Sequence, residues 1–111
     1  MRVAVFSLRL YEKSVTRLLT AAERIALENS IATDPEAHPV IPGAGGVRKA
    51  RWGRGASGKR GGVRAIYYYL ASGSTVYMLA VYAKADKEDL TEREKQELKR
   101  VAIALKGGQV Q

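Results

Sequence analysis

Cysteine is absent from this chain of 111 residues, which excludes a disulfide scaffold, thiolate metal sites and cysteine nucleophiles. The longest apolar run, Val76–Ala83, is far shorter than the roughly 20 residues that span a bilayer, so we predict no transmembrane helix and no membrane partner. Residues 1–9 lack a small-residue cleavage site, so we predict no secretory signal and a cytoplasmic location. Because His38 is the single histidine, a paired-histidine ribonuclease mechanism is excluded.

Acidic residues are absent between positions 37 and 85. The chain carries 19 Lys and Arg against 11 Asp and Glu, and the flanking segments 1–36 and 86–111 each balance their charges. The whole net charge of +8 therefore lies in the middle segment, on Arg48, Lys49, Arg51, Arg54, Lys59, Arg60, Arg64 and Lys84. A localised basic block without carboxylates indicates a polyanionic partner and favours nucleic acid over an acidic protein. It also offers no ligands for Mg²⁺, so we predict no metal site and no cofactor.

The first third of the chain predicts a strand followed by helix. Residues 2–10 are rich in Val, Phe and Leu, as in a strand. Apolar residues then recur at helical spacing, as one helix or a helical hairpin requires, at Val15, Leu18, Leu19, Ala22, Ile25 and Ala26. Thr20 and Glu23 match a capping box, so a second helix is predicted to begin there and to end before Pro35.

The remainder predicts a loop, three strands and a helix. The loop covers residues 36–46, and the strands cover 47–52, 63–71 and 76–83, the last two joined as an antiparallel hairpin. A second capping box at 91–94 begins the last helix, which Gly107 and Gly108 end. We therefore predict an α+β fold in one domain, 1–111, with a small, antiparallel-dominated sheet, an N-terminal helix or helical hairpin and a C-terminal helix.

Alternation along the two hairpin strands predicts which side chains share a face. One face of the first hairpin strand carries Arg64, Ile66, Tyr68 and Leu70. One face of the second carries Val76, Met78, Ala80, Tyr82 and, just beyond its end, Lys84. Tyr68 and Tyr82 are therefore the aromatic residues best placed to stack on bases beside cations.

The glycine-rich run 53–60 comes within one residue of a Walker A loop. We reject that function because Arg60 stands where a hydroxyl must bind Mg²⁺, and because Gly61 and Gly62 lead into a strand instead of a helix. Two interpretations stay open for this loop: it approaches a phosphate backbone with Arg54, Lys59 and Arg60, or it is a solvated hairpin loop.

Three stretches carry a resemblance to a known family: Ile41 to Trp52 (IPGAGGVRKARW), Gly58 to Tyr69 (GKRGGVRAIYYY) and Leu79 to Lys84 (LAVYAK). With the helix that starts near Asp89, they resemble the RelE/HigB branch of the RelE/ParE toxin superfamily over nearly the whole chain. The resemblance implies a small sheet with helices and a basic surface that cuts messenger RNA in the ribosomal A site. It also implies neutralisation by a cognate helix-turn-helix, DNA-binding antitoxin, with operator DNA bound only through the toxin–antitoxin complex.

Metal-independent RNA cleavage by a 2′-hydroxyl needs that hydroxyl activated, the phosphorane charge stabilised and the leaving oxygen protonated. We expect Arg64 to stabilise the phosphate and Lys84 to act as general acid or base, with Lys49 and Arg51 sharing in catalysis. Arg48, Arg54, Lys59, Arg60, Tyr68 and Tyr82 are expected to bind RNA or the ribosome. The chain departs from RelE after Lys84, where Ala85 replaces an arginine and residues 86–91 contain no tyrosine.

Two other functions remain open at this point. A ParE-like gyrase inhibitor shares the fold, although its activity needs no phosphate-cleaving cluster of the kind formed by Lys49, Arg51, Arg64 and Lys84. A non-enzymatic nucleic-acid-binding module would use the same cations without turnover. For either toxin, we expect the antitoxin to dock on the sheet edges and the first helices.

Overall fold

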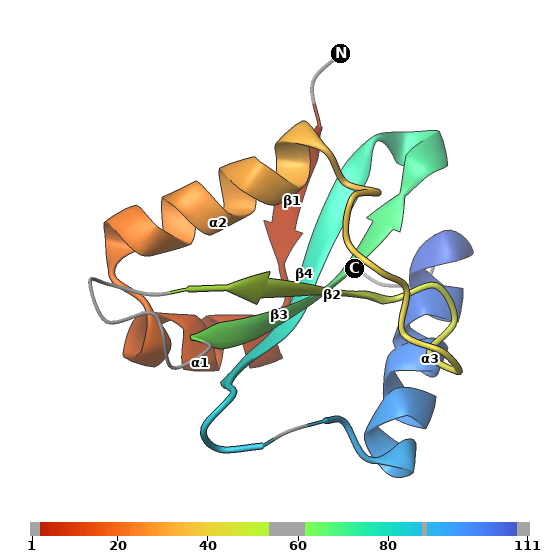
Figure 1. The fold of residues 1–111 in the computed structure, drawn as a ribbon. Coiled ribbons are helices and arrows are strands. Elements are labelled where there is room, and N and C mark those ends of the chain that lie inside the picture. Colours follow the sequence, from red (N-terminus) through yellow and green to blue (C-terminus); the bar gives the residue numbers. More distant parts are fainter. Residues whose placement is uncertain (1–2, 54–61, 88, 109–111) are drawn as a thin grey trace.

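The computed structural model describes residues 3–53, 62–87 and 89–108. The elements follow the predicted order of strand, helices, three strands and helix, and the first helical segment is a hairpin (Figure 1). They are β1 (Ala4–Ser7), α1 (Arg9–Leu18), α2 (Ala21–Thr33), β2 (Arg48–Trp52), β3 (Val63–Leu70), β4 (Thr75–Ala83) and α3 (Glu92–Lys106). None of the described helices has the length and apolarity to cross a lipid bilayer. The α+β prediction is confirmed.

The four strands form one mixed sheet in the order β1-β4-β3-β2. The β2–β3 and β3–β4 pairs are antiparallel, as predicted for the hairpin, and β1 pairs in parallel with β4. A 3-10 turn at Ala71–Gly73 joins β3 to β4, and Ser74 closes it in the left-handed conformation at φ 48°. The two long strands therefore lie in the middle of the sheet.

The first strand is shorter than predicted. It ends at Ser7, and the backbone N–H of Leu8 donates to the Met78 carbonyl at 2.9 Å before α1 begins. Assigning residues 9 and 10 to the strand was wrong, because the Leu8 carbonyl accepts from the Glu12 N–H and so begins the helix. No side chain caps this helix start, so the sequence carried no signal for it. Ile25, predicted on the buried helical face, is 59% exposed.

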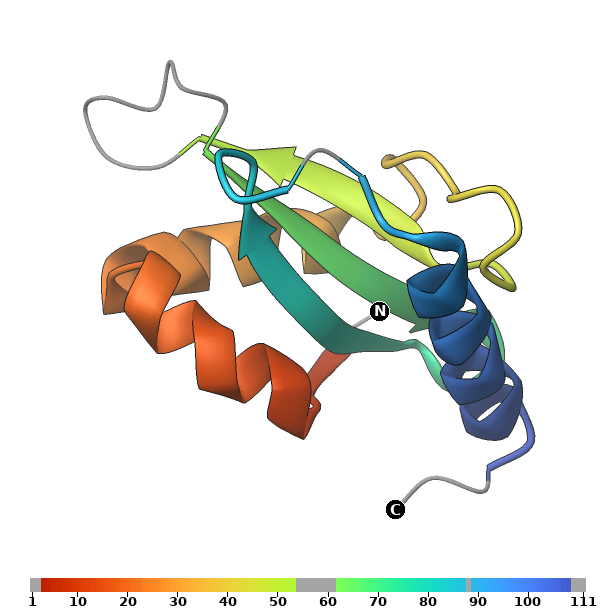
Figure 2. The same ribbon diagram turned by 90° about the horizontal axis from the view of Figure 1, so that it is seen from below.

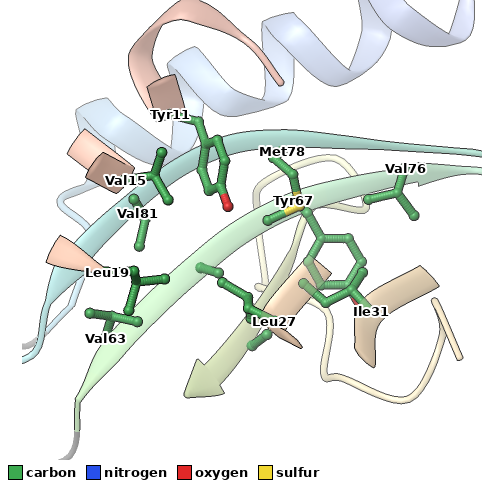
Figure 3. Packing of buried hydrophobic residues seen from close by; sticks show 12 residues of the cluster. Tyr11, Val15, Leu19, Leu27, Ile31, Val63, Tyr67, Val76, Met78 and Val81 are labelled. Atoms are coloured by element: carbon green, nitrogen blue, oxygen red, sulfur yellow. The ribbon is translucent and has the colours of Figure 1, made fainter. Parts of the chain in front are cut away.

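Each face of the sheet has its own apolar core, with α1 and α2 on one face and α3 on the other (Figure 2). The first core joins the helical hairpin to the sheet, and Figure 3 shows Tyr11, Leu27 and Ile31 meeting Tyr67 and Met78 there. The second core packs α3 and the 41–47 loop on the opposite face, with Ile66, Tyr68, Leu79, Ala102 and Leu105 among its buried members.

A β-bulge sets which side chains of β4 reach each face. The register of β3 against β4 shifts between Ile66 and Tyr67, which leaves Leu79 without a partner on β3. The prediction that Met78 and Tyr82 share a face was therefore wrong. Met78 lies in the core beneath α1 and α2, whereas Tyr82 lies on the α3 side.

Both predicted capping boxes are present. In α2 the Thr20 hydroxyl accepts from the Glu23 N–H, and the Glu23 carboxylate accepts from the Thr20 N–H. Thr91 and Glu94 make the same pair at the start of α3. Each box satisfies two backbone donors that a helix start leaves open, and α2 ends at Thr33, before Pro35 as predicted.

Candidate nucleic-acid interface

Strand register brings predicted cations into one row across the sheet. Arg51 of β2 lies opposite Arg64 of β3, and Arg64 lies opposite Tyr82 of β4. Lys49 is two residues before Arg51, so it projects from the same face of β2. This is the face on which α3 packs, because Tyr82 belongs to the α3-side core.

Lys84 extends this row by one position. Its backbone N–H donates to the Gly62 carbonyl at 3.1 Å, so pairing with the chain before β3 continues just past the end of β4. Alternation from Tyr82 then places Lys84 on the same face, and its side chain is exposed. We call Lys49, Arg51, Arg64 and Lys84 the cationic cluster. The structure thus brings the four predicted catalytic residues to one face of the sheet, with Arg51, Arg64 and Lys84 near one end and Lys49 further along β2.

Arg64 differs from the other members of the cluster in being buried. It is 6% exposed, and its Nη1 donates to the Val63 carbonyl at 3.3 Å. Burial limits the motion of the Arg64 side chain, and a guanidinium carries a positive charge in proteins. Arg64 is therefore a positive charge held in place, whereas the neighbouring Arg51 side chain is exposed to solvent.

Tyr82 is half-buried beside Arg64. Burial raises its pKa, Asp89 and Glu94 raise it further, and the Arg64 charge opposes them. The ammonium of Lys87 lies 5.5 Å from the centre of the ring, and the hydroxyl is buried without a hydrogen-bond partner among the described residues. Tyr82 therefore lies in the row with Arg64, and the Lys87 ammonium already lies over its ring.

A cavity of about 280 Å³ lies next to the cluster. It is lined by Lys49 and Arg51 of β2, by Asp89 of the connection from β4 to α3, and by Lys95 of α3. The Lys49 ammonium lies 3.5 Å from the Asp89 carboxylate. The middle segment contains no acidic residue of its own, but the fold places a carboxylate beside it. Asp89 lies 40 positions after Lys49 in the sequence.

Several predicted RNA-binding residues lie elsewhere. Arg48 alternates to the opposite face of β2, where its guanidinium donates to the carbonyls of Glu36 and His38 at 3.2 and 2.7 Å. Tyr68 is 8% exposed within the α3-side core, so its ring faces are covered by protein. Arg54, Lys59 and Arg60 lie outside the described residues.

Sequence reasoning missed Asp89, Lys87 and Lys95, which the structure adds to the edge of this face. All three belong to the charge-balanced segment 86–111, and nothing local in it shows where α3 returns to the sheet. Within residues 3–53, 62–87 and 89–108, no three His, Asp or Glu side chains come together as metal ligands.

Comparison with known proteins places this arrangement in context. A family model described as the RelE toxin of the RelE/RelB toxin-antitoxin system matches residues 41–110. The structure is similar to an arginine-to-alanine double mutant of the E. coli toxin RelE in the free state, with TM-score 0.59 and 19% identity over 87% of this chain and 97% of that one. It is also similar to a chain of the intact E. coli RelBE toxin-antitoxin complex, with TM-score 0.53 and 19% identity over 73% and 95% of the two chains. At these identities the structural likeness establishes the fold.

Proposed function

The chain belongs to the RelE toxin family, and we propose that it is a ribosome-dependent mRNA endonuclease, the toxin of a toxin–antitoxin pair. The observation that carries this proposal is the row in which Arg51, Arg64 and Tyr82 lie opposite one another, flanked by Lys49 and Lys84. The family match covers residues 41–110, so all five of these residues lie inside it.

The proposed reaction is transesterification within the RNA strand. The 2′-oxygen of one nucleotide bonds to the adjacent phosphorus, and the bond from phosphorus to the 5′-oxygen of the next nucleotide breaks. The proton of the 2′-hydroxyl passes to a base, and the departing 5′-oxygen receives a proton from an acid. The products are a 2′,3′-cyclic phosphate and a 5′-hydroxyl.

Arg64 is proposed to hold the negative charge that grows on the phosphorane oxygens. Because it is buried at 6% exposure, water competes weakly for its donors and the guanidinium needs little reorganisation as the charge develops. Lys49 and Arg51 hold the phosphate from the neighbouring strand. An Arg cannot serve as a base, since it keeps its proton in proteins.

Lys84 is the proposed proton-transfer group. It is exposed, it follows β4 directly, and Lys, unlike Arg, can act as a general base or acid. The arrangement needs no metal ion, because each task of the reaction falls to a cation of the chain. With Lys84 and Arg51 open to solvent, the substrate geometry depends on the ribosome, which we propose presents the codon to this face.

A cognate antitoxin is the second proposed partner, and ribosome-bound mRNA is the substrate. Three large apolar side chains stand exposed on β1, α1 and α2: Phe6 at 57%, Leu10 at 59% and Ile25 at 59%. They lie at the β1 edge of the sheet and on the first helices, where an antitoxin segment would cover them. Operator DNA is then reached through the antitoxin's own DNA-binding domain.

The function is tested by mapping cuts in mRNA by primer extension after a reconstituted translation reaction, with and without ribosomes. The exposed variants Arg51→Gln and Lys84→Gln leave the cores intact, and Arg64→Lys keeps a charge at the buried position. Arg17→Ala, on the exposed surface of α1, is the matched control. We expect cuts in A-site codons that need ribosomes, with rates lowered about 10²-fold or more in each cluster variant and unchanged in the control.

Cleavage of free RNA at the same rate would contradict the dependence on ribosomes. Absence of cuts in both reactions would contradict the nuclease and favour a gyrase inhibitor, which a DNA supercoiling assay detects. Cuts that persist at full rate in the Lys84→Gln and Arg51→Gln proteins would contradict the assignment of the cluster.

A further inference from the structure

The cavity beside the cationic cluster is lined by two chemically different sets of residues. One set is cationic and consists of Lys49, Arg51 and Lys95. The other is apolar and consists of residues 39–42 (Pro-Val-Ile-Pro) and Leu90. A nucleotide has the same division, with an anionic phosphate at one end and an apolar base face at the other.

The three cations come from two elements that are far apart in the sequence. Lys49 and Arg51 stand on β2, and Lys95 stands in the first turns of α3, where its backbone N–H donates to the Thr91 carbonyl at 3.0 Å. The Lys95 ammonium lies 3.4 Å from the Glu92 carboxylate, an exposed partner that leaves the ammonium able to turn into the cavity. The capping box formed by Thr91 and Glu94 fixes this helix start and so fixes the position of Lys95.

Asp89 is an anion that already lies against one cation of this cavity. Its carboxylate lies 3.5 Å from the Lys49 ammonium, and its side chain is 73% exposed. An exposed ion pair of this kind is weak and exchanges readily with other anions. Asp89 thus places a carboxylate in a cavity that Arg51 and Lys95 also line.

We propose that this cavity is a nucleotide subsite, which binds one nucleotide of the RNA strand next to the scissile phosphate and from which Asp89 is displaced. The subsite rests on the proposed function, because Arg51 joins it to the cleavage row through its pairing with Arg64. Its volume of about 280 Å³ is just below the range of roughly 300–1,000 Å³ for ligand pockets, which suits a single nucleotide. Lys95 is thereby assigned as a binding residue outside the reaction row.

The first test measures binding of a short single-stranded RNA to the purified protein by fluorescence anisotropy. Asp89→Asn should tighten binding about two- to fivefold at low salt, because the competing carboxylate is gone. Asp86→Asn is the matched control, since Asp86 is an exposed acid on the same connection that does not line the cavity. Equal tightening by both variants would show a general charge effect and would overturn the role of Asp89.

The second test follows the salt dependence of the same binding. Lys95→Gln should weaken binding and make the slope of log K against log salt shallower by about 0.7, the value for one phosphate contact on a single strand. Lys99→Gln, one turn further along α3 and outside the cavity, should change the slope less. Identical slopes for the two variants would overturn the subsite.

The third test asks whether the apolar residues that line the cavity contact the base of a nucleotide. In NMR titrations, uridine monophosphate should shift the methyl resonances of Val40, Ile41 and Leu90, whereas inorganic phosphate should leave them in place. Shifts with neither ligand, or equal shifts with both, would overturn the nucleotide assignment. These tests need no ribosome and no cleavage, so a failed subsite and a failed nuclease are separately visible.

Discussion

Gly62 lies at the end of the sheet that carries Arg51, Arg64 and Lys84. It adopts φ +56°, in the left-handed region, and a Cβ built on it would lie 2.0 Å from the Trp52 carbonyl oxygen and 2.8 Å from the Gly53 Cα. Its own carbonyl accepts from the Lys84 N–H at 3.1 Å. Replacing Gly62 with alanine therefore forces the end of β2 away from the start of β3. The same movement disturbs the hydrogen bond from Lys84 to position 62.

The cost of Gly62→Ala has two parts. Holding alanine in the left-handed region costs about 1–2 kcal/mol. Relief of a 2.0 Å contact with backbone requires the strand end to move, which weakens the bond to Lys84 and neighbouring ladder bonds at about 0.5–1.5 kcal/mol each. The free energy of unfolding should fall by about 2–4 kcal/mol in total.

Gly43→Ala separates these two parts. Gly43 also has a positive φ, of +81°, but nothing lies within 4 Å of a Cβ built there, so only the conformational cost of about 1–2 kcal/mol applies. Urea unfolding followed by the fluorescence of Trp52, the single tryptophan, measures both variants. If Gly62→Ala is no less stable than Gly43→Ala, the steric reasoning is refuted.

Two further predictions concern ion pairs away from the cluster. Arg24 of α2 bridges to Glu12 of α1 and pairs with Glu28 of its own helix at 2.8 Å. Arg24→Ala should therefore lower the free energy of unfolding by about 1–2 kcal/mol in urea titrations, and an unchanged midpoint would contradict this bridge. The Lys87 ammonium lowers the pKa of Glu94, so the stability from this pair is present at neutral pH and is lost as pH falls below the ordinary Glu value through the lowered one. Glu94→Gln keeps the helix cap, and its Tm deficit against wild type should shrink between pH 7 and pH 3; a constant deficit would argue against the pair.

Local hydrogen bonding made part of this fold predictable. In both capping boxes the side-chain oxygen and the backbone N–H that it accepts from are three residues apart. Thr20 and Thr91 therefore predict a helix start from local sequence alone. The start of α1 carries no such signal, because Leu8 has no capping side chain. Its position depends on the bond from Leu8 to Met78, a residue 70 positions away.

Which side chains of β4 point to each face of the sheet could not be predicted either, because the pairing with β3 is irregular. Alternation assumes one residue per pairing position, and the extra residue at Leu79 reverses the faces on either side of it. Nothing in the run Val76–Ala83 distinguishes Leu79 from its apolar neighbours. The bulge places Tyr82 opposite Arg64, so it contributes directly to the candidate interface.

For the interface itself, charge counting found the residues but not their surroundings. The four members of the cluster were predicted from an acid-free segment, and strand pairing brings them to one face. Asp89 and Lys95 come from a segment whose charges cancel, and they join the face only because α3 packs back on the sheet. The sequence pattern alone does not show that α3 packs against this face of the sheet; the apolar core between them shows it.

The central claim is that a cationic cluster cuts RNA by attack of a 2′-hydroxyl, and the chemistry of the cut ends tests it most directly. Mass spectrometry of mRNA fragments from the ribosomal reaction should show a 2′,3′-cyclic phosphate, or its hydrolysed phosphate, on the upstream fragment and a 5′-hydroxyl on the downstream one. Fragments with a 3′-hydroxyl and a 5′-phosphate would mean that water attacked the phosphorus, and would contradict the role given to Arg64 and Lys84.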